Sequence, residues 1–162
     1  MSYVDLHVHS NASDGTLSPE QVVRLAHEAG LSAIALTDHD TTAGVAGAAE
    51  AGAELGLEVV PGIEVSSSFR DHEIHILGLF VDTDSPSLQA ALKEFRHHRD
   101  QRNQEMLGRF DAHGIHLTAE DLCAGNPDTV ITRAHVARAL LAKGLGPDLD
   151  HIFKKYLQYG GI

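Results

Sequence analysis

Apolar segments of strand length alternate with helix-like segments over the first 67 residues, and this order limits the fold more than any other feature of the sequence. The segments 4–8, 33–36 and 57–67 have the character of strands, and the segments 18–29 and 43–55 have the character of helices. Strands that are joined through helices become parallel neighbours in one sheet. The sequence therefore predicts an α/β fold with a parallel sheet, either open or closed into a barrel.

The signals at the ends of the first helix support this assignment. Ser18 has the character of an N-cap, Pro19 suits the first helical position, and Gln21 completes a capping box. Gly30 then ends the helix, because glycine readily adopts the left-handed conformation that follows a helix.

The second half of the chain differs from the first. After a fourth predicted strand over 73–80, only helix-like segments follow. Capping residues or proline mark their starts, at Ser85, Thr118, Thr132 and Pro147. We therefore expect an α/β part over 1–83 and a helical part over 84–157.

The amino-acid composition limits the kinds of partner that this protein is expected to bind. The formal net charge of −11 argues against binding of duplex DNA or an anionic membrane through bulk charge. The sequence has no apolar run of membrane-spanning length and no secretory signal at its start, so we expect a cytoplasmic protein. The single cysteine, Cys123, excludes an intrachain disulfide and a zinc site built from several thiolates. A phosphate-bearing substrate stays compatible with this charge if bound metal ions reverse it locally.

Imidazoles and carboxylates follow the predicted strands in succession. They are His7 and His9 at the end of the first strand, Asp14 in the loop beyond it, His39 after the second strand, Glu64 at the end of the third, and His75 within the fourth. Residues two apart on a strand share a face, so His7 and His9 are able to hold one ion together. Burying such groups without partners costs several kcal/mol each, and a shared metal site removes that cost. We therefore predict a metal centre rather than a scatter of core and turn residues.

The donor types and their number indicate which metals to expect. Imidazole mixed with carboxylate suits Zn, Mn or Fe, whereas a site of oxygen ligands alone would suit Mg or Ca. Six candidate ligands exceed what one tetrahedral ion needs, so we expect two or more ions. Glu64 is the best candidate for a carboxylate that bridges two ions about 3.5–4 Å apart. Such a centre activates water and binds both the attacking and the leaving oxygen of a phosphate ester.

Several segments resemble the motifs of a known family. The stretches "DLHVHSNASDG", "LTDHDT", "GIEVS" and "HILG" resemble successive motifs of the PHP family, named for polymerase and histidinol phosphatase. The stretches "ITRAHVARALLAKG" and "IFKKYL" resemble the helical insert of its stand-alone metal-dependent phosphoesterases. Members of that branch remove phosphate from nucleotides such as 3′,5′-bisphosphorylated adenosine, or degrade short RNA from its 5′ end. The resemblance implies a substrate of this class.

The resemblance also implies a fold. PHP proteins form a distorted barrel of about seven βα units, so this chain is expected to form a partial distorted (β/α)7 barrel with a small helical insert. On this basis, residues 1–83 are the N-terminal part of the barrel, residues 84–157 are the insert, and residues 158–162 begin the return to the barrel.

The resemblance further implies a trinuclear metal site. Its three positions would be held respectively by His7 with His9, by Glu64 with His75, and by Asp14 with His39. Glu64 would bridge the first ion to the second. We expect two to three divalent ions, Mn, Zn or Fe with Mg as an option, and hydrolysis by metal-activated water without a protein nucleophile.

Two family motifs are absent from the sequence. Family members continue past the insert with further βα units, which contribute an "HP" histidine and a late "SDxH" aspartate and histidine. Neither motif occurs in residues 1–162. The resemblance therefore implies a truncated chain that holds six of the family's nine usual ligands.

Two aspartates flank the predicted ligand His39. We assign Asp38 and Asp40 to the surroundings of the metal centre rather than to the ligand set. Asp38 either orients His39 as a hydrogen-bond acceptor or caps the turn, and the sequence leaves both roles open.

The long predicted helix interrupts its apolar stripe with Arg99 and Arg102. These guanidinium groups either lie at the edge of the stripe and pair with nearby acids, or bind a substrate phosphate at the mouth of the active site. Arg133 and His135, in the first turn of a later helix, would add a second anion contact near a helix N-terminus. We predict substrate-binding roles for these four residues.

Two other function classes compete with a phosphoesterase. An amidohydrolase-type enzyme that cleaves C–N bonds would also begin with two histidines on its first strand, but Asp14, the "TDHD" turn and Glu64 favour phosphate chemistry. A non-catalytic metal-binding module would retain the ligands and bind metal without turnover. Comparing hydrolysis of a chromogenic phosphate ester with deamination of a nucleoside separates the three.

Overall fold

The computed structural model describes residues 3–70, 72–123 and 126–158. The chain divides into two compact units, residues 1–96 and 97–162, each with a hydrophobic core of its own. The first unit contains a four-stranded sheet with helices, and the described part of the second contains helices only. The predicted α/β fold is therefore confirmed.

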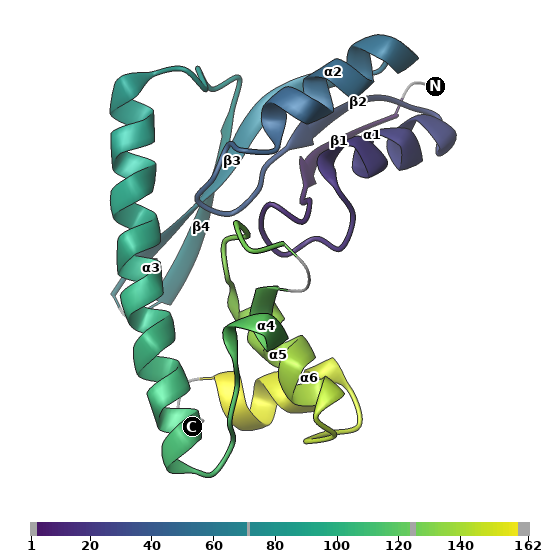
Figure 1. Ribbon diagram of the computed structural model, residues 1–162. Coiled ribbons are helices and arrows are strands. Elements are labelled where there is room, and N and C mark those ends of the chain that lie inside the picture. The colour runs from purple at the N-terminus through teal and green to yellow at the C-terminus, as the bar shows by residue number, and fades with distance from the viewer. Residues whose placement is uncertain (1–2, 71, 124–125, 159–162) are drawn as a thin grey trace. The chain divides into compact units, whose positions relative to one another are not determined.

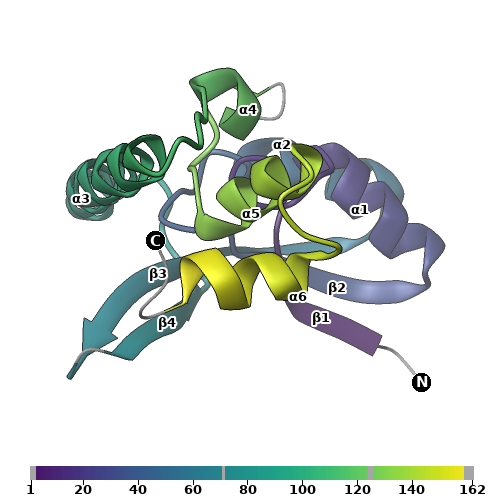
Figure 2. The same ribbon diagram turned by 90° about the horizontal axis from the view of Figure 1, so that it is seen from below.

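The sheet has the strand order β1-β2-β3-β4. Its strands are β1 (Tyr3–Val8), β2 (Leu31–Leu36), β3 (Glu58–Phe69) and β4 (His72–Leu79). The first three strands run parallel, and they are joined through α1 (Pro19–Glu28) and α2 (Val45–Leu55). Figures 1 and 2 show both helices on the same face of the sheet. The carboxyl ends of the parallel strands consequently meet at one edge, where sites gather in α/β folds.

The cap of α1 has the geometry that the sequence predicted. The Ser18 side chain accepts a hydrogen bond from the backbone of Gln21, and the Gln21 side chain accepts one from the backbone of Ser18. Val22, Val23 and Ala26 form the buried face of the helix in the core of the first unit. The polar cap and the apolar stripe together fix where the helix begins and which side it buries.

The fourth strand differs from the parallel arrangement that the alternation of elements suggests. Strand β4 pairs antiparallel with β3, with Ser66 opposite His75. Only two residues separate the strands, and a parallel connection needs a crossover of a dozen or more. His75 therefore reaches the end of the sheet from the middle of a hairpin strand, not from the carboxyl end of a parallel one.

The described sheet is curled into a half-barrel that is open at β1 and β4. Apolar side chains are exposed at both edges, where Val4 is 55% exposed and Ile76 is 56% exposed. Side chains of this kind become buried when another element covers the edge of a sheet. The open half-barrel agrees with the predicted partial (β/α)7 barrel.

Helix α3 (Pro86–Ala112) runs through the boundary between the two units. We expected the helical insert to begin at residue 84, just before this helix, and that boundary stays a prediction. The side chain of Gln89 donates to Thr42 Oγ1 at 3.0 Å, and Arg96 donates to the carbonyl oxygen of Asp40 at 3.1 Å. These long-range hydrogen bonds explain why the units divide within the helix.

The second unit contains the rest of α3 with α4 (Ala119–Cys123), α5 (Arg133–Ala142), α6 (Leu149–Ile152) and the π-helical turn η1 (Phe153–Leu157). Its core includes Phe110, Leu122, Val136, Leu140 and Ile152, all nearly inaccessible to solvent. The return to the barrel was predicted over residues 158–162, and of these 159–162 lie outside the described residues. Among the residues that the structure describes, no helix has the length and apolar character of a membrane span.

Candidate metal centre

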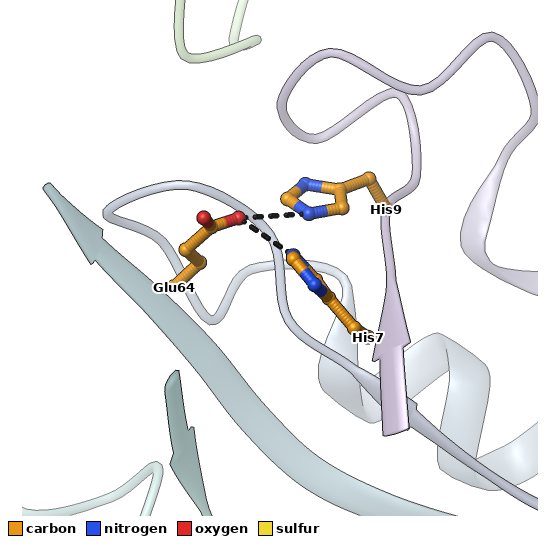
Figure 3. Close-up of side chains that lie close together, drawn as sticks. All are labelled: His7, His9 and Glu64. Atoms are coloured by element: carbon orange, nitrogen blue, oxygen red, sulfur yellow. Dashed lines mark hydrogen bonds and ion pairs between the residues drawn. The ribbon is translucent and has the colours of Figure 1, made fainter. Parts of the chain in front are cut away.

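Glu64 lies at the centre of the predicted ligand set. It is on β3 and only 4% exposed. Figure 3 shows His7 on β1 and His9 just beyond it, both pointing toward Glu64. The Nε2 atoms of His7 and His9 lie 3.0 Å and 2.9 Å from the same oxygen, Glu64 Oε2. The two-residue spacing at the end of β1 thus places both rings on one carboxylate oxygen.

Two further histidines approach Glu64 from neighbouring elements. His75 Nδ1 lies 2.7 Å from the other carboxylate oxygen, Oε1. His39 follows β2 and forms an isolated parallel bridge with Glu64, which places its Nδ1 atom 3.5 Å from Oε2. One carboxylate is therefore surrounded by four imidazole rings, with contacts to both of its oxygens.

Asp14 completes the cluster from the loop after β1. Its two carboxylate oxygens lie 3.3 Å from His9 Nδ1 and 3.4 Å from His39 Nε2. His9 and His39 therefore each present one ring nitrogen to Asp14 and the other to Glu64.

The six residues form three overlapping triads with metal-ligand geometry: His7, His9 and Glu64; His9, Asp14 and His39; and His39, Glu64 and His75. Each pair of triads has one residue in common. A carboxylate such as Glu64 bridges two ions readily, whereas an imidazole normally binds one. The first and third triads, linked through Glu64, therefore suit two ions without any shared imidazole.

The chemistry of the cluster fits a bound cation. His39 Nδ1 is buried and has no hydrogen-bond partner in the part of the chain that the structure describes. An unpartnered buried nitrogen is costly, and a metal ion is a partner that the neighbouring carboxylate would also accept. The mixed nitrogen and oxygen donors match the ligand preferences of Zn, Mn and Fe.

The charges of the cluster are set by its close contacts. Burial tends to raise the pKa of Asp14, but hydrogen bonds from His39 and His9 outweigh it and hold that pKa well below its usual value. Burial likewise opposes a lowered pKa at Glu64, yet the contacts with His7, His39 and His75 prevail. Both carboxylates are therefore ionised near neutral pH. The pKa of His9 is raised despite its burial, mainly because of the hydrogen bond with Asp14.

The sequence matches the family profile of the PHP domain over residues 5–161, which is almost the whole chain. The chain belongs to the PHP domain family. The predicted resemblance is thereby confirmed.

The PHP chain is similar over nearly its full length to two curated bacterial enzymes. It is 40% identical over 162 residues to the 3′,5′-nucleoside bisphosphate phosphatase of Chromobacterium violaceum, covering 99% of this chain and 56% of the relative. It is 40% identical over 161 residues to the 5′-3′ exoribonuclease Rnm of Escherichia coli, covering 96% of this chain and 54% of the relative. The chain thus spans little more than half the length of these relatives.

Two solved structures have the same fold. A protein assigned as a metal-dependent phosphoesterase from Bifidobacterium adolescentis superposes with a TM-score of 0.87 at 30% identity, covering 99% of this chain and 58% of the neighbour. An amidohydrolase from Chromobacterium violaceum, solved with bound sulfate and no metal, gives a TM-score of 0.90 at 40% identity, with 98% and 56% covered.

Asp38 contacts the loop after β1 of the PHP chain and not His39. Its carboxylate accepts hydrogen bonds from the backbone N–H and hydroxyl of Ser10 and from the hydroxyl of Ser13. Burial raises the pKa of Asp38, and these hydrogen bonds oppose the shift. Of the two roles that the sequence left open, orientation of His39 finds no supporting contact among the described residues.

Asp40 ties the turn around His39 to β3. Its backbone N–H donates to the carbonyl oxygen of Glu64 at 3.0 Å, and its side chain accepts from the backbone N–H of Ser66 at 2.9 Å. Its φ of 52° is unusual for a residue other than glycine, and aspartate tolerates this region better than most. Asp40 thus holds His39 beside Glu64 through the backbone.

Gly15 allows the loop that carries Asp14 to fold back on itself. A Cβ atom at this position would lie 2.5 Å from the carbonyl oxygen of His9. We expect Gly15→Ala to displace the loop, to lower the free energy of unfolding by about 1–3 kcal/mol, and to weaken metal binding. Chemical unfolding and metal titration measure both effects.

Gly108 provides the matched control for that substitution. It lies within α3, and a Cβ atom there would meet nothing within 4 Å. Gly108→Ala is expected to stabilise the helix by up to about 1 kcal/mol, because alanine is the better helix former. Equal stability losses in the two variants would contradict the tight packing at Gly15.

The four predicted substrate-binding residues all belong to the second unit. Arg99 is 7% exposed and shares the buried side of α3 with Met106 and Phe110, and Arg102 is half-buried. Arg133 begins α5, and its burial lowers the pKa of the guanidinium. Their substrate-binding role remains a prediction.

His135 is buried and takes part in the cap of α5. Its Nδ1 atom accepts a hydrogen bond from the backbone N–H of Thr132 at 3.1 Å, and the Thr132 hydroxyl accepts from the backbone of Ala134. These contacts use groups that the predicted anion contact at the helix N-terminus would need.

Asn103 was not predicted from the sequence. It is 5% exposed, its amide donates to the carbonyl oxygen of Ile131 at 3.0 Å, and its Oδ1 atom has no hydrogen-bond partner in the described ranges. It follows Arg99 by one helical turn, so the same interruption of the apolar stripe could have indicated it.

Proposed function

We propose that this PHP domain belongs to a metal-dependent phosphoesterase that hydrolyses phosphate esters of nucleotides or of RNA 5′ ends. The observation that carries the proposal is the convergence of four imidazoles and two carboxylates into three metal-ligand triads. The names of the curated relatives, a nucleoside bisphosphate phosphatase and an exoribonuclease, support this substrate class.

The bound ions would supply the reactive chemistry. Divalent ions lower the pKa of water and neutralise the negative charge that develops on a phosphate ester. His7, His9 and Glu64 would hold one ion, and His39, Glu64 and His75 a second. Asp14 would complete a third position with ligands beyond these six. We propose two to three ions, with Mn, Zn or Fe preferred and Mg as an option.

The ionised carboxylates of this chain would prepare the site for cations. Glu64 contacts the ligand histidines through both of its oxygens, which fixes the rings around it. Asp14 accepts from His9 and His39 on the side away from Glu64.

The single cysteine, Cys123, is free, which suits a reducing compartment such as the cytoplasm.

The proposal is tested by phosphate release from 3′,5′-bisphosphorylated adenosine and from a short 5′-phosphorylated RNA. The full-length protein, stripped of metal and then supplied with Mn²⁺, Zn²⁺ or Fe²⁺, is expected to release phosphate or mononucleotides, and chelation is expected to abolish release. Absence of release with every ion would contradict a phosphoesterase. Metal binding without turnover would instead indicate a non-catalytic module.

One neighbour favours a second candidate function. The solved structure with a TM-score of 0.90 is named an amidohydrolase, which suggests hydrolysis of C–N bonds as an alternative function for this chain. Deamination of adenosine without hydrolysis of phosphate esters would support that function. We favour the phosphoesterase, because both curated relatives act on phosphate esters.

We propose that Arg99, Arg102, Arg133 and His135 recognise the phosphate groups of the substrate. Losing a hydrogen bond to a charged group costs about 1.5–3 kcal/mol, so Arg133→Ala is expected to raise KM about 10–100-fold with little change in kcat. Arg138→Ala, in the same helix, is the control and should leave KM unchanged. Steady-state kinetics with a nucleotide phosphate measures KM for both variants. Equal KM values for Arg133→Ala and Arg138→Ala would contradict this role.

A further inference from the structure

We propose that Asp38 is a positioning residue that fixes which nitrogen of His9 binds metal. It acts through the hydroxyl of Ser13 and lies outside the ligand set. The inference rests on the proposed metal centre and adds a role for a carboxylate whose hydrogen bonds within the described residues go to Ser10 and Ser13. It predicts that His9 binds through Nε2 in the triad with His7 and Glu64.

The contacts of Asp38 are short and buried. Asp38 is 2% exposed, and Ser10 and Ser13 are fully buried. Asp38 Oδ1 accepts from the Ser10 backbone N–H at 2.8 Å and from the Ser13 hydroxyl at 2.6 Å, and Oδ2 accepts from the Ser10 hydroxyl at 2.6 Å. A carboxylate just beyond the end of β2 therefore anchors the loop after β1 at two points.

These contacts set the direction of the hydrogen bond between Ser13 and His9. The Ser13 hydroxyl has one proton and gives it to Asp38, so toward His9 its oxygen acts as an acceptor. The His9 Nδ1 atom lies 3.3 Å from that oxygen and must carry the proton of the pair. Asp14 Oδ1, at 3.3 Å from the same nitrogen, is a second acceptor and favours the same proton position.

The other nitrogen of His9 is then available as a ligand. In a neutral ring, a proton on Nδ1 leaves the lone pair on Nε2, and this atom faces Glu64 Oε2 at 2.9 Å. An imidazole whose second nitrogen donates to a polar partner is the usual arrangement in metal sites. The structure therefore separates His9 from the triad with Asp14 and His39.

The same loop connects Asp38 to Asp14. Ser13 precedes Asp14 directly, and the loop is closed by the hydrogen bond from the Gly15 backbone N–H to the carbonyl oxygen of Ser10 at 2.8 Å. Loss of the Asp38 carboxylate would release both Ser10 and Ser13. We therefore expect the positions of His9 and Asp14 to loosen together, while His75 on β4 keeps its contact with Glu64.

The test combines three variants with two measurements on the full-length protein. Asp38→Ala removes all three hydrogen bonds, and Asp38→Asn keeps an oxygen that accepts from Ser10 and Ser13. Ser13→Ala removes the hydroxyl that joins Asp38 to His9 but leaves both hydrogen bonds from Ser10 to Asp38 in place. Zn²⁺ affinity is expected to fall about 10–100-fold in Asp38→Ala, to fall less in Ser13→Ala, and to recover largely in Asp38→Asn. Asp84→Asn, an exposed aspartate of the same unit, is the charge control.

The second measurement is the ¹⁵N NMR spectrum of the His9 ring. In the Zn²⁺-loaded protein, His9 is expected to carry its proton on Nδ1. A proton on Nε2, or Zn²⁺ affinity in Asp38→Ala equal to that of the unmodified protein, would overturn the inference. Failure of the unmodified protein to bind Zn²⁺ would overturn the proposed function instead, whereas tight Zn²⁺ binding by the unmodified protein and by Asp38→Ala alike would overturn the role of Asp38 alone. Ser13→Ala keeps the test decisive if Asp38→Ala fails to fold.

Discussion

Replacement of Glu64 by glutamine is expected to reduce affinity for divalent ions by more than 100-fold and to abolish phosphate release. The carboxylate contacts four imidazoles and belongs to two of the three triads. Glutamine keeps the shape of the side chain but loses the negative charge and one acceptor oxygen. Removing a group that only supports a ligand costs about 10–100-fold in affinity, so loss of a shared ligand should exceed that range.

Glu58→Gln is the matched control for this substitution. Glu58 begins the same strand, β3, and is exposed. Titration with Mn²⁺, followed by electron paramagnetic resonance, is expected to show tight binding for Glu58→Gln and for the unmodified protein, but not for Glu64→Gln. Equal affinities in all three proteins would place the ions elsewhere.

Metal is expected to reverse the pH dependence of stability. In the metal-free protein, the raised pKa of His9 stabilises the fold fully below the ordinary histidine pKa of 6.5, and this contribution is lost as pH rises through the folded-state pKa. The lowered pKa values of Asp14 and Glu64 stabilise the fold above the ordinary pKa values of these side chains, 3.8 and 4.5, and these contributions are lost as pH falls through the folded-state pKa values. At about pH 5.5 all three contributions are present, whereas at pH 8 the contribution of His9 is lost. The metal-free fold should therefore be more stable at about pH 5.5 than at pH 8.

Bound ions are expected to reverse this pH dependence of stability. Metal ligation requires deprotonated imidazoles, so affinity rises as the histidines lose their protons. Ions present at 1,000 times their dissociation constant add about 4 kcal/mol to the free energy of unfolding. Chemical unfolding followed by circular dichroism should therefore show metal-loaded protein to be more stable at pH 8 than at pH 5.5. A metal effect of the same size at both pH values would contradict histidine ligation.

The sequence predicted those parts of the fold that depend on local patterns. The alternation at Val4, Leu6 and Val8 indicated β1, and the residues around Ser18 indicated the start of α1. The direction of β4 was less accessible, because it depends on a connection of two residues at the tip of a hairpin. The division within α3 depends on long-range contacts such as that between Arg96 and Asp40, which no local pattern reveals.

The candidate metal centre also combines features that local sequence patterns predict with features that depend on tertiary contacts. The six predicted ligands converge because each follows or lies in a strand of one curled sheet, and the structure brings all six together. The partner of Asp38 was not predictable, since it lies 28 residues earlier in a loop whose path is set by tertiary contacts. Asn103 was missed although it continues, one helical turn later, the polar interruption of the apolar stripe at Arg99.

Anomalous diffraction from crystals of the full-length protein soaked in Mn²⁺ tests the central claim most directly. We expect two peaks that share Glu64, one between His7 and His9 and one between His39 and His75. A third peak at Asp14 would indicate additional ligands from outside the six residues. Absence of anomalous density at Glu64 under saturating Mn²⁺ would contradict the proposed metal centre.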